Sequence, residues 1–131
     1  MSYVFDSSSI FEALIRGVVR ALSGQYTVEL ARFELNNILW KRRTLLKGIG
    51  DEELTRLAKV LKRVLDLMNV VSIQCCEEAV LDVAGRLNLT FYDASYVYVA
   101  REKELPMVTE DHGLKLRASG YVEVLSLDDL L

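Results

Sequence analysis

The order of apolar segments along this chain predicts an α/β fold: a central parallel sheet of about four to five strands, covered by helices on both faces as a three-layer sandwich. Short apolar runs alternate with longer segments whose apolar residues recur at helical spacing. Strands separated by helices pair in parallel, because the chain must cross one face of the sheet before the next strand begins. The 131 residues contain no repeat, linker or low-complexity tract, so we expect a single domain over residues 1–131.

The beginning of the chain predicts a strand, two short helices and a second strand. The first strand is expected over residues 1–5, which end in an apolar run. The serines at positions 7 to 9 can cap a helix over residues 10–15. A shorter helix over residues 18–22 ends before a Ser-Gly pair, and residues 26–28 form a possible short strand.

Two longer helices are expected next. The first covers residues 29–43, and one side of it carries Leu30, Phe33, Asn37 and Trp40. Two glycines interrupt the pattern, and Asp51 is then placed to cap a helix over residues 52–67, whose apolar residues form one stripe.

The second half of the chain continues the alternation. Strands are expected over residues 70–73, 107–109 and 121–125, and helices over residues 75–87, 92–103 and 112–118. Pro106 stops the helix over residues 92–103 and leads into the strand that follows, and Gly120 ends the last helix. Residues 127–131 form a final acidic turn.

Composition narrows the classes of protein to consider. No apolar stretch approaches the ~20 residues of a membrane span, and the start MSYVFDSSS lacks a basic segment, so we expect a cytoplasmic protein without a membrane partner. A net charge of −3 gives no overall attraction to nucleic acid, but clustered metal-binding acids would lower that total. The two cysteines are adjacent, which disfavours a disulfide, and we expect them to serve ordinary packing.

Four acidic residues stand in apolar surroundings. Asp6 and Asp111 each follow an expected strand, at the edge of a parallel sheet where ligands bind. Glu34 and Asp93 lie on expected helices and share a face with apolar neighbours, so both are expected to point inward. A carboxylate in such surroundings pairs, takes up a proton or binds a cation, so we expect the four to converge and at least one to have a raised pKa.

The types of residue favour a hard metal ion at this cluster. Carboxylate oxygens are the ligands that Mg²⁺ and Mn²⁺ prefer, whereas the chain offers one histidine and no spaced cysteine pair for zinc. If the site forms, at least three of the acids must lie close enough to share an ion, directly or through its waters. Four carboxylates are consistent with one ion or with two.

In their order along the chain, these landmarks resemble the PIN-domain family, and most closely the VapC-type toxins of prokaryotic VapBC toxin–antitoxin pairs. The resemblance covers essentially the whole chain and rests on four segments: FDSSSI at 5–10, ARFELNNILWK at 31–41, LTFYDASY at 89–96 and LPMVTED at 105–111. Each segment alone is a weak match, and the four in this order make a strong one.

The resemblance implies a metal-dependent endoribonuclease with a Mg²⁺ or Mn²⁺ cofactor, an RNA substrate, a VapB-type antitoxin partner and a homodimer. The implied metal-binding and catalytic acids are Asp6, Glu34, Asp93 and Asp111. Thr109 matches the family's small hydroxyl residue, which can orient a carboxylate or a metal-bound water. Ser8 matches a position that is often small and polar, and Glu110 is expected to face away from Asp111.

Other interpretations remain open at this stage. Asp93 and Asp111 can each cap a helix, His112 is expected at the surface, and the basic run at 41–43 is typical of a solvated helix end that can also touch RNA. Trp40, Tyr96 and Tyr98 are expected in the core or a dimer contact. The alternatives to a toxin are a non-catalytic PIN-like domain that binds RNA or protein, a housekeeping RNA-processing nuclease and, more distantly, a DNA 5′-nuclease.

Overall fold

Five short strands form one parallel sheet, in the order β3-β2-β1-β4-β5. The structure, a computed structural model, describes residues 1–131. The strands are β1 (Val4–Phe5), β2 (Tyr26–Val28), β3 (Asn69–Val71), β4 (Met107–Val108) and β5 (Val124–Leu125). This arrangement confirms the predicted α/β class and parallel sheet.

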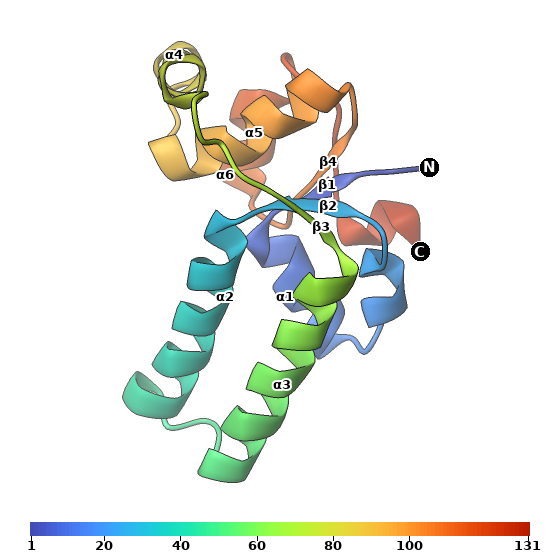
Figure 1. Ribbon diagram of the computed structural model, residues 1–131, viewed down its shortest axis with the longest axis vertical. Helices are drawn as coiled ribbons and strands as arrows, with labels where there is room; N and C mark the ends of the chain where they lie inside the picture. Colours follow the sequence, from blue (N-terminus) through green and yellow to red (C-terminus); the bar gives the residue numbers. More distant parts are fainter.

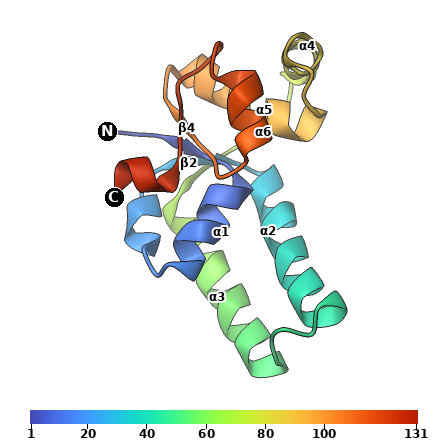
Figure 2. The ribbon, with the colours of Figure 1, turned by 180° about the vertical axis from the view of Figure 1, so that it is seen from behind.

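Helices cover both faces of the sheet, as Figure 1 shows. The helices are α1 (Ser7–Ile15), α2 (Leu30–Trp40), α3 (Asp51–Leu67), α4 (Glu77–Leu87), α5 (Phe91–Lys103) and α6 (His112–Ala118). The helices α1, α2 and α3 lie on one side, and α4, α5 and α6 lie on the other, which the reverse view in Figure 2 confirms. Three shorter helical turns complete the chain: η1 (Val19–Leu22), η2 (Lys41–Leu45) and η3 (Leu127–Leu130). No helix is long and apolar enough to cross a membrane.

The topology creates a switch point between β1 and β4. After β1 the chain moves outward through β2 to β3, and it then returns through α4 and α5 to place β4 on the other side of β1. Connections therefore leave β1 and β4 in opposite directions, and in open parallel sheets ligands bind beyond the carboxyl ends of strands at such a point. Asp6 and Thr109 are the residues that directly follow them.

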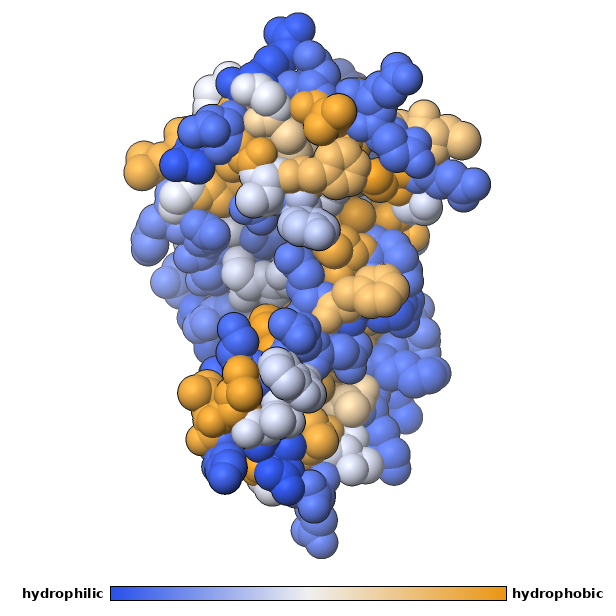
Figure 3. All heavy atoms as spheres, turned by 90° about the vertical axis from the view of Figure 1, so that its left-hand side faces the viewer, coloured by the Kyte–Doolittle hydropathy of each residue, from blue (hydrophilic) through white to orange (hydrophobic).

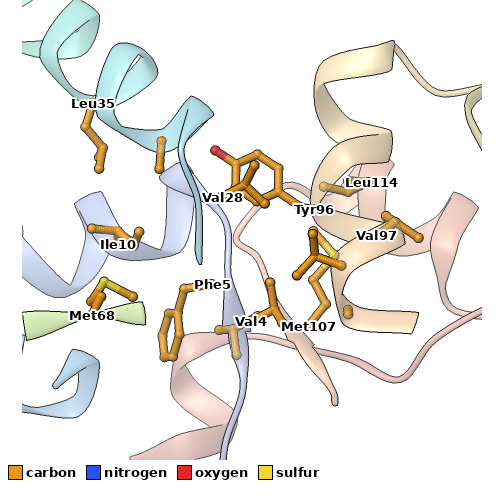
Figure 4. Packing of buried hydrophobic residues seen from close by; sticks show 14 of the residues in the cluster. Val4, Phe5, Ile10, Val28, Leu35, Met68, Tyr96, Val97, Met107 and Leu114 are labelled. Atoms are coloured by element: carbon orange, nitrogen blue, oxygen red, sulfur yellow. The ribbon is translucent and has the colours of Figure 1, made fainter. Parts of the chain in front are cut away.

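The buried core lies on both faces of β1. Val4 and Phe5 are fully buried and point to opposite faces, because successive side chains of a strand alternate. Figure 4 shows Ile10, Leu35 and Met68 on one side of this strand, and Tyr96, Val97 and Leu114 on the other. Because both faces of β1 are packed, this strand holds Asp6, the residue that follows it, in a fixed position.

Several expected details of the helices were wrong. The side of α2 that carries Phe33 and Trp40 is not its buried face: these side chains are 69% and 49% exposed, whereas the buried residues are Ala31, Leu35 and Leu39. The helix ends at Trp40 and continues as the single π-turn η2, so the expected span to residue 43 combines two helix types. Trp40 therefore lies at the surface rather than in the core, and its alternative role in a dimer contact stays a prediction, whereas Tyr96 belongs to the core.

The expected caps were also partly wrong. Helix α1 begins at Ser7, and its cap is the side chain of Asp6 rather than the serines. Helix α3 is preceded by Gly50, and Asp51 is its first residue, ion-paired with Arg43 (Nε–Oδ1, 2.8 Å). The cap of α5 is Thr90, whose hydroxyl accepts from the Asp93 backbone N–H, so the Asp93 side chain is free of this structural role.

Candidate functional site

Asp6 is a buried carboxylate surrounded by hydroxyl groups. It follows β1 and is 4% exposed. Its Oδ1 accepts hydrogen bonds from Ser8 Oγ (2.7 Å), from the Ser9 backbone N–H (2.9 Å) and from Ser9 Oγ (3.0 Å). Its Oδ2 accepts from Thr109 Oγ1, which follows β4. The hydrogen bond from Thr109 therefore joins the carboxyl ends of β1 and β4 at the switch point.

Burial makes the ionised form of Asp6 costly. Loss of hydration raises the pKa of Asp6 to about 6, although the hydrogen bonds from Thr109, Ser9 and Ser8 act in the opposite direction. Such a carboxylate, with its solvation replaced by hydroxyls, is stabilised by a nearby positive charge. This confirms that at least one acid of the cluster has a raised pKa.

The segment after β4 places its two acids on different sides. The backbone N–H of Asp111 donates to Thr109 Oγ1 (3.1 Å), and Asp111 Oδ1 accepts from the Leu114 N–H (3.1 Å), which caps α6. The Glu110 carboxylate instead accepts from the Leu127 N–H at the start of η3 (3.0 Å). The predicted cap by Asp111 is thus confirmed, and Glu110 is engaged outside the cluster.

Glu34 is held by the hydroxyl of a buried tyrosine. Tyr96 is 1% exposed, and its Oη donates to Glu34 Oε1 across 2.6 Å, which joins α5 to α2. Figure 4 shows the Tyr96 oxygen directed toward α2. Burial, followed by the bond to Glu34 and by the charges of Glu34 and Asp6, raises the pKa of Tyr96, so the hydroxyl keeps its proton and remains a donor.

Asp93 is half-buried and shares its surroundings with two other acids. Its pKa is raised first by burial and then by the negative charges of Asp111 and Glu34. Tyr96 in turn experiences the charges of Glu34 and Asp6, so Asp6 lies near the other three acids with Tyr96 between them. We call Asp6, Glu34, Asp93 and Asp111 the acidic cluster.

The side chains of the acidic cluster do not surround a single point. No group of three or more His, Cys, Asp or Glu side chains is arranged to hold a metal ion directly. The expectation of direct sharing is therefore not met in this arrangement, because the oxygens are turned to other partners: Asp6 to hydroxyls, Glu34 to Tyr96 and Asp111 to the start of α6. The chemistry of the donors still fits a hard cation, because mutually repelling carboxylates gain from a shared positive charge.

Two contributions to the site were missed from the sequence. Tyr96 was expected only in the core or a dimer contact, and Ser9 was read as part of a helix cap, yet both hydroxyls bind a cluster carboxylate. The spacing of three between Asp93 and Tyr96 on one helix was the available signal. His112 is exposed at the start of α6, as expected, and the basic run lies in η2, which directly follows α2.

Comparisons with known proteins agree on one group. The chain is 37% identical over 100 residues to a protein named Exonuclease VapC9 from Pyrobaculum aerophilum. The aligned region covers 76% of this chain and 71% of that protein. The crystal structure of PAE2754 from Pyrobaculum aerophilum superposes with a TM-score of 0.80 at 29% identity, over 99% of this chain and 95% of that one. No protein-family model matches the chain.

The burial of Asp6 predicts that Asp6→Asn stabilises the metal-free protein. The rise in the pKa of Asp6 to about 6 means that ionising this carboxylate in the folded protein costs about 3 kcal/mol at neutral pH. Asparagine removes the charge, and its amide can use the same hydroxyl partners. We expect the free energy of unfolding in EDTA at pH 7 to rise by about 1–3 kcal/mol, measured by urea denaturation.

The same carboxylate sets a pH dependence. A raised folded-state pKa means that the native protein binds the proton more tightly than the unfolded chain, so Asp6 contributes stability at low pH that is lost as pH rises from about 4 to about 6. The advantage of Asp6→Asn over the wild type should therefore shrink as pH falls through this window. An advantage that is equal at pH 4 and pH 7 would contradict the assignment.

The bond between Tyr96 and Glu34 is testable by a double-mutant cycle. Tyr96→Phe leaves the buried ring in place and removes only the hydroxyl, which should cost about 1–3 kcal/mol of stability. In a Glu34→Ala background the same change should cost less by at least about 0.5 kcal/mol, because the partner is already absent. Additive effects of the two substitutions on urea denaturation would show that the side chains are not coupled.

Proposed function

Because this chain belongs to the VapC family of PIN-domain proteins, we propose that it is a divalent-metal-dependent ribonuclease, the toxin of a toxin–antitoxin pair. The observation that carries the proposal is the acidic cluster at the switch point: the charges of Asp111 and Glu34 act on Asp93, and Thr109 links Asp6 to the Asp111 backbone. The name of the relative from Pyrobaculum aerophilum, an exonuclease, supports nucleic-acid hydrolysis as the activity. These acids would then hold Mg²⁺ or Mn²⁺.

The residues of the chain would divide the work as follows. Asp6, Glu34, Asp93 and Asp111 would hold the ion, which when bound supplies an activated water and neutralises charge on the phosphate. Thr109 binds Asp6 Oδ2 and receives the Asp111 N–H, so it fixes two acids relative to each other. Tyr96 on α5 donates a hydrogen bond to Glu34 Oε1 and so holds the Glu34 side chain toward α5. These neutral donors orient carboxylates without adding positive charge that would compete with a cation.

The mode of cleavage is a separate part of the proposal. The family resemblance favours cuts within an RNA chain, whereas the relative's name records cleavage from an end. The two modes differ in their products: internal cuts give discrete fragments at early times, and cleavage from an end gives mononucleotides. A circular RNA, which has no ends, is cut only by the first mode.

The competing proposal is a non-catalytic PIN-like domain that binds RNA or protein. The observation that favours it is that no three potential ligands are arranged to hold a metal directly. A housekeeping RNA-processing nuclease would share the chemistry of the toxin and differ in its partners and its target. Both alternatives are separated from the toxin by the experiments below.

Cleavage by the purified protein should require a divalent ion and the acidic cluster. We expect RNA hydrolysis with Mg²⁺ or Mn²⁺, none in excess EDTA, and a loss of at least about a hundredfold in Asp93→Asn, because the charge that would hold the ion is removed. Asp82→Asn is the matched control, since Asp82 is an exposed acid on α4 that is paired with Arg86. Hydrolysis that persists in EDTA would rule out the metal mechanism.

Binding without hydrolysis would favour the competing proposal. Mn²⁺ should raise the melting temperature of the wild type and of Asp82→Asn, but much less that of Asp93→Asn. If RNA binds and no ion stabilises the wild type, the domain is a binding module rather than an enzyme.

We further propose that residues 1–131 fold as one domain, act in the cytoplasm, form a homodimer and bind a small VapB-type antitoxin. The antitoxin would place an Arg or Lys near the acidic cluster and compete with the ion. Co-expression with the neighbouring short reading frame should yield a complex that neither cleaves RNA nor responds to Mn²⁺. Light scattering that finds only monomer at high micromolar concentration would contradict the dimer.

A further inference from the structure

We infer that a pocket beside the acidic cluster receives one unpaired base of the RNA substrate, next to the phosphate that is cut. This inference rests on the proposed function and names how that site would grip its substrate. The pocket has a volume of about 230 Å³ and is lined mainly by Val28, Leu30, Ile73, Phe91, Tyr92 and Ser95. We call it the β2–β3 pocket.

The β2–β3 pocket and the acidic cluster lie along the same edge of the sheet. Val28 ends β2, and Ile73 follows shortly after the end of β3, with which β2 is paired in register. Asp6 and Thr109 follow β1 and β4, the next two strands. Since neighbouring strands are about 4.8 Å apart, the middle of the β2–β3 pair lies roughly 7 Å from the line of β1. A strand of RNA laid along this edge reaches both places.

The chain also ties the walls of the pocket to the acids. Leu30 lies one helical turn before Glu34 on α2, and Tyr92 directly precedes Asp93 on α5. The hydrogen bond from Tyr96 to Glu34 spans the same two helices. A ligand in the pocket is therefore in contact with the two helices that carry half of the acidic cluster.

The chemistry of the pocket suits a flat, uncharged ring. Its only charged lining residue, Glu29, is already paired with Arg32 (Oε1–Nε, 2.8 Å), so the pocket presents no free charge. Tyr92 stands 61% exposed at the rim beside the half-buried Phe91, where a base can stack on a ring. Ser72, also in the lining, accepts from the Gln74 N–H and keeps its own proton to donate to the edge of a base.

The size of the pocket favours one base over larger ligands. Sites for drug-sized molecules occupy about 300–1,000 Å³, so 230 Å³ suits a single ring system. Figure 3 looks onto the side of the molecule that carries α2 and α4, where apolar side chains gather in the upper half of the face and again at the tip of the α2–α3 hairpin. The tip lies at the end of the hairpin that is remote from the sheet (Figure 1).

The test measures coupling between the pocket and one base. Short single-stranded RNAs, each with one abasic position, are bound to the Asp93→Asn protein, so that no cleavage is needed for the readout. We expect one abasic position to weaken binding by about tenfold or more, which is the contribution of one stacked base. Ile73→Trp, which fills the pocket, should remove this sensitivity, and Tyr92→Ala should reduce it while Tyr92→Phe retains it.

The controls separate this inference from the proposed function. Leu116→Ala, which removes an apolar side chain that is 81% exposed on α6, should leave the abasic sensitivity unchanged. An equal sensitivity in Ile73→Trp, or RNA binding that no single base affects, overturns the inference even if the wild type cleaves RNA. If Ile73→Trp instead weakens only the antitoxin complex, the pocket receives a protein side chain and the inference is wrong. Absence of cleavage by the wild type, with the base coupling intact, contradicts the proposed function alone.

Discussion

The hydrogen bond from Thr109 to Asp6 is the contact on which the rest of the site depends. It joins the ends of β1 and β4, the two strands that border the switch point, and it uses a donor that itself receives the Asp111 N–H. A carboxylate that is 4% exposed needs such partners, because burial without them costs several kcal/mol. The core beneath β1 keeps Asp6 in place, and Asp6 in turn caps α1.

The groups that orient the acids are uncharged, so they leave the negative charge of the acids in place. Hydroxyls of Ser8, Ser9, Thr109 and Tyr96 orient the carboxylates, but none neutralises them. The negative charges therefore remain concentrated: the pKa of Asp93 is raised first by its burial and then by the charges of Asp111 and Glu34. A divalent cation is the partner that removes this repulsion most effectively, and a basic side chain of a protein partner is its natural competitor.

The sequence was sufficient for the order of elements and the sheet, since alternation of strands and helices leaves few topologies. The sequence was less reliable in predicting which face of a helix is buried. On α2, Phe33 and Trp40 are apolar yet face solvent, while Ala31, Leu35 and Leu39 are buried, so hydropathy alone does not identify the buried face. The grouping of the four acids was predicted from strand ends and helix faces, and the structure brings Glu34 and Asp111 close enough for their charges to act on Asp93. The partner of Tyr96 was not predicted, because a hydrogen bond across 62 residues leaves no local pattern. Ser9 lies only three residues from Asp6, but its serine cluster was interpreted as a helix cap alone.

The central claim is that the four carboxylates form one divalent-metal site. A crystal structure of the wild-type protein with Mn²⁺, recorded at a wavelength where manganese scatters anomalously, tests it most directly. We expect an anomalous peak between Asp6 and Asp93, with oxygens of at least three cluster acids at about 2.0–2.6 Å or bridged by water, after rotation of the side chains that now bind other partners. A saturating Mn²⁺ soak that gives no anomalous peak between these acids would contradict the account.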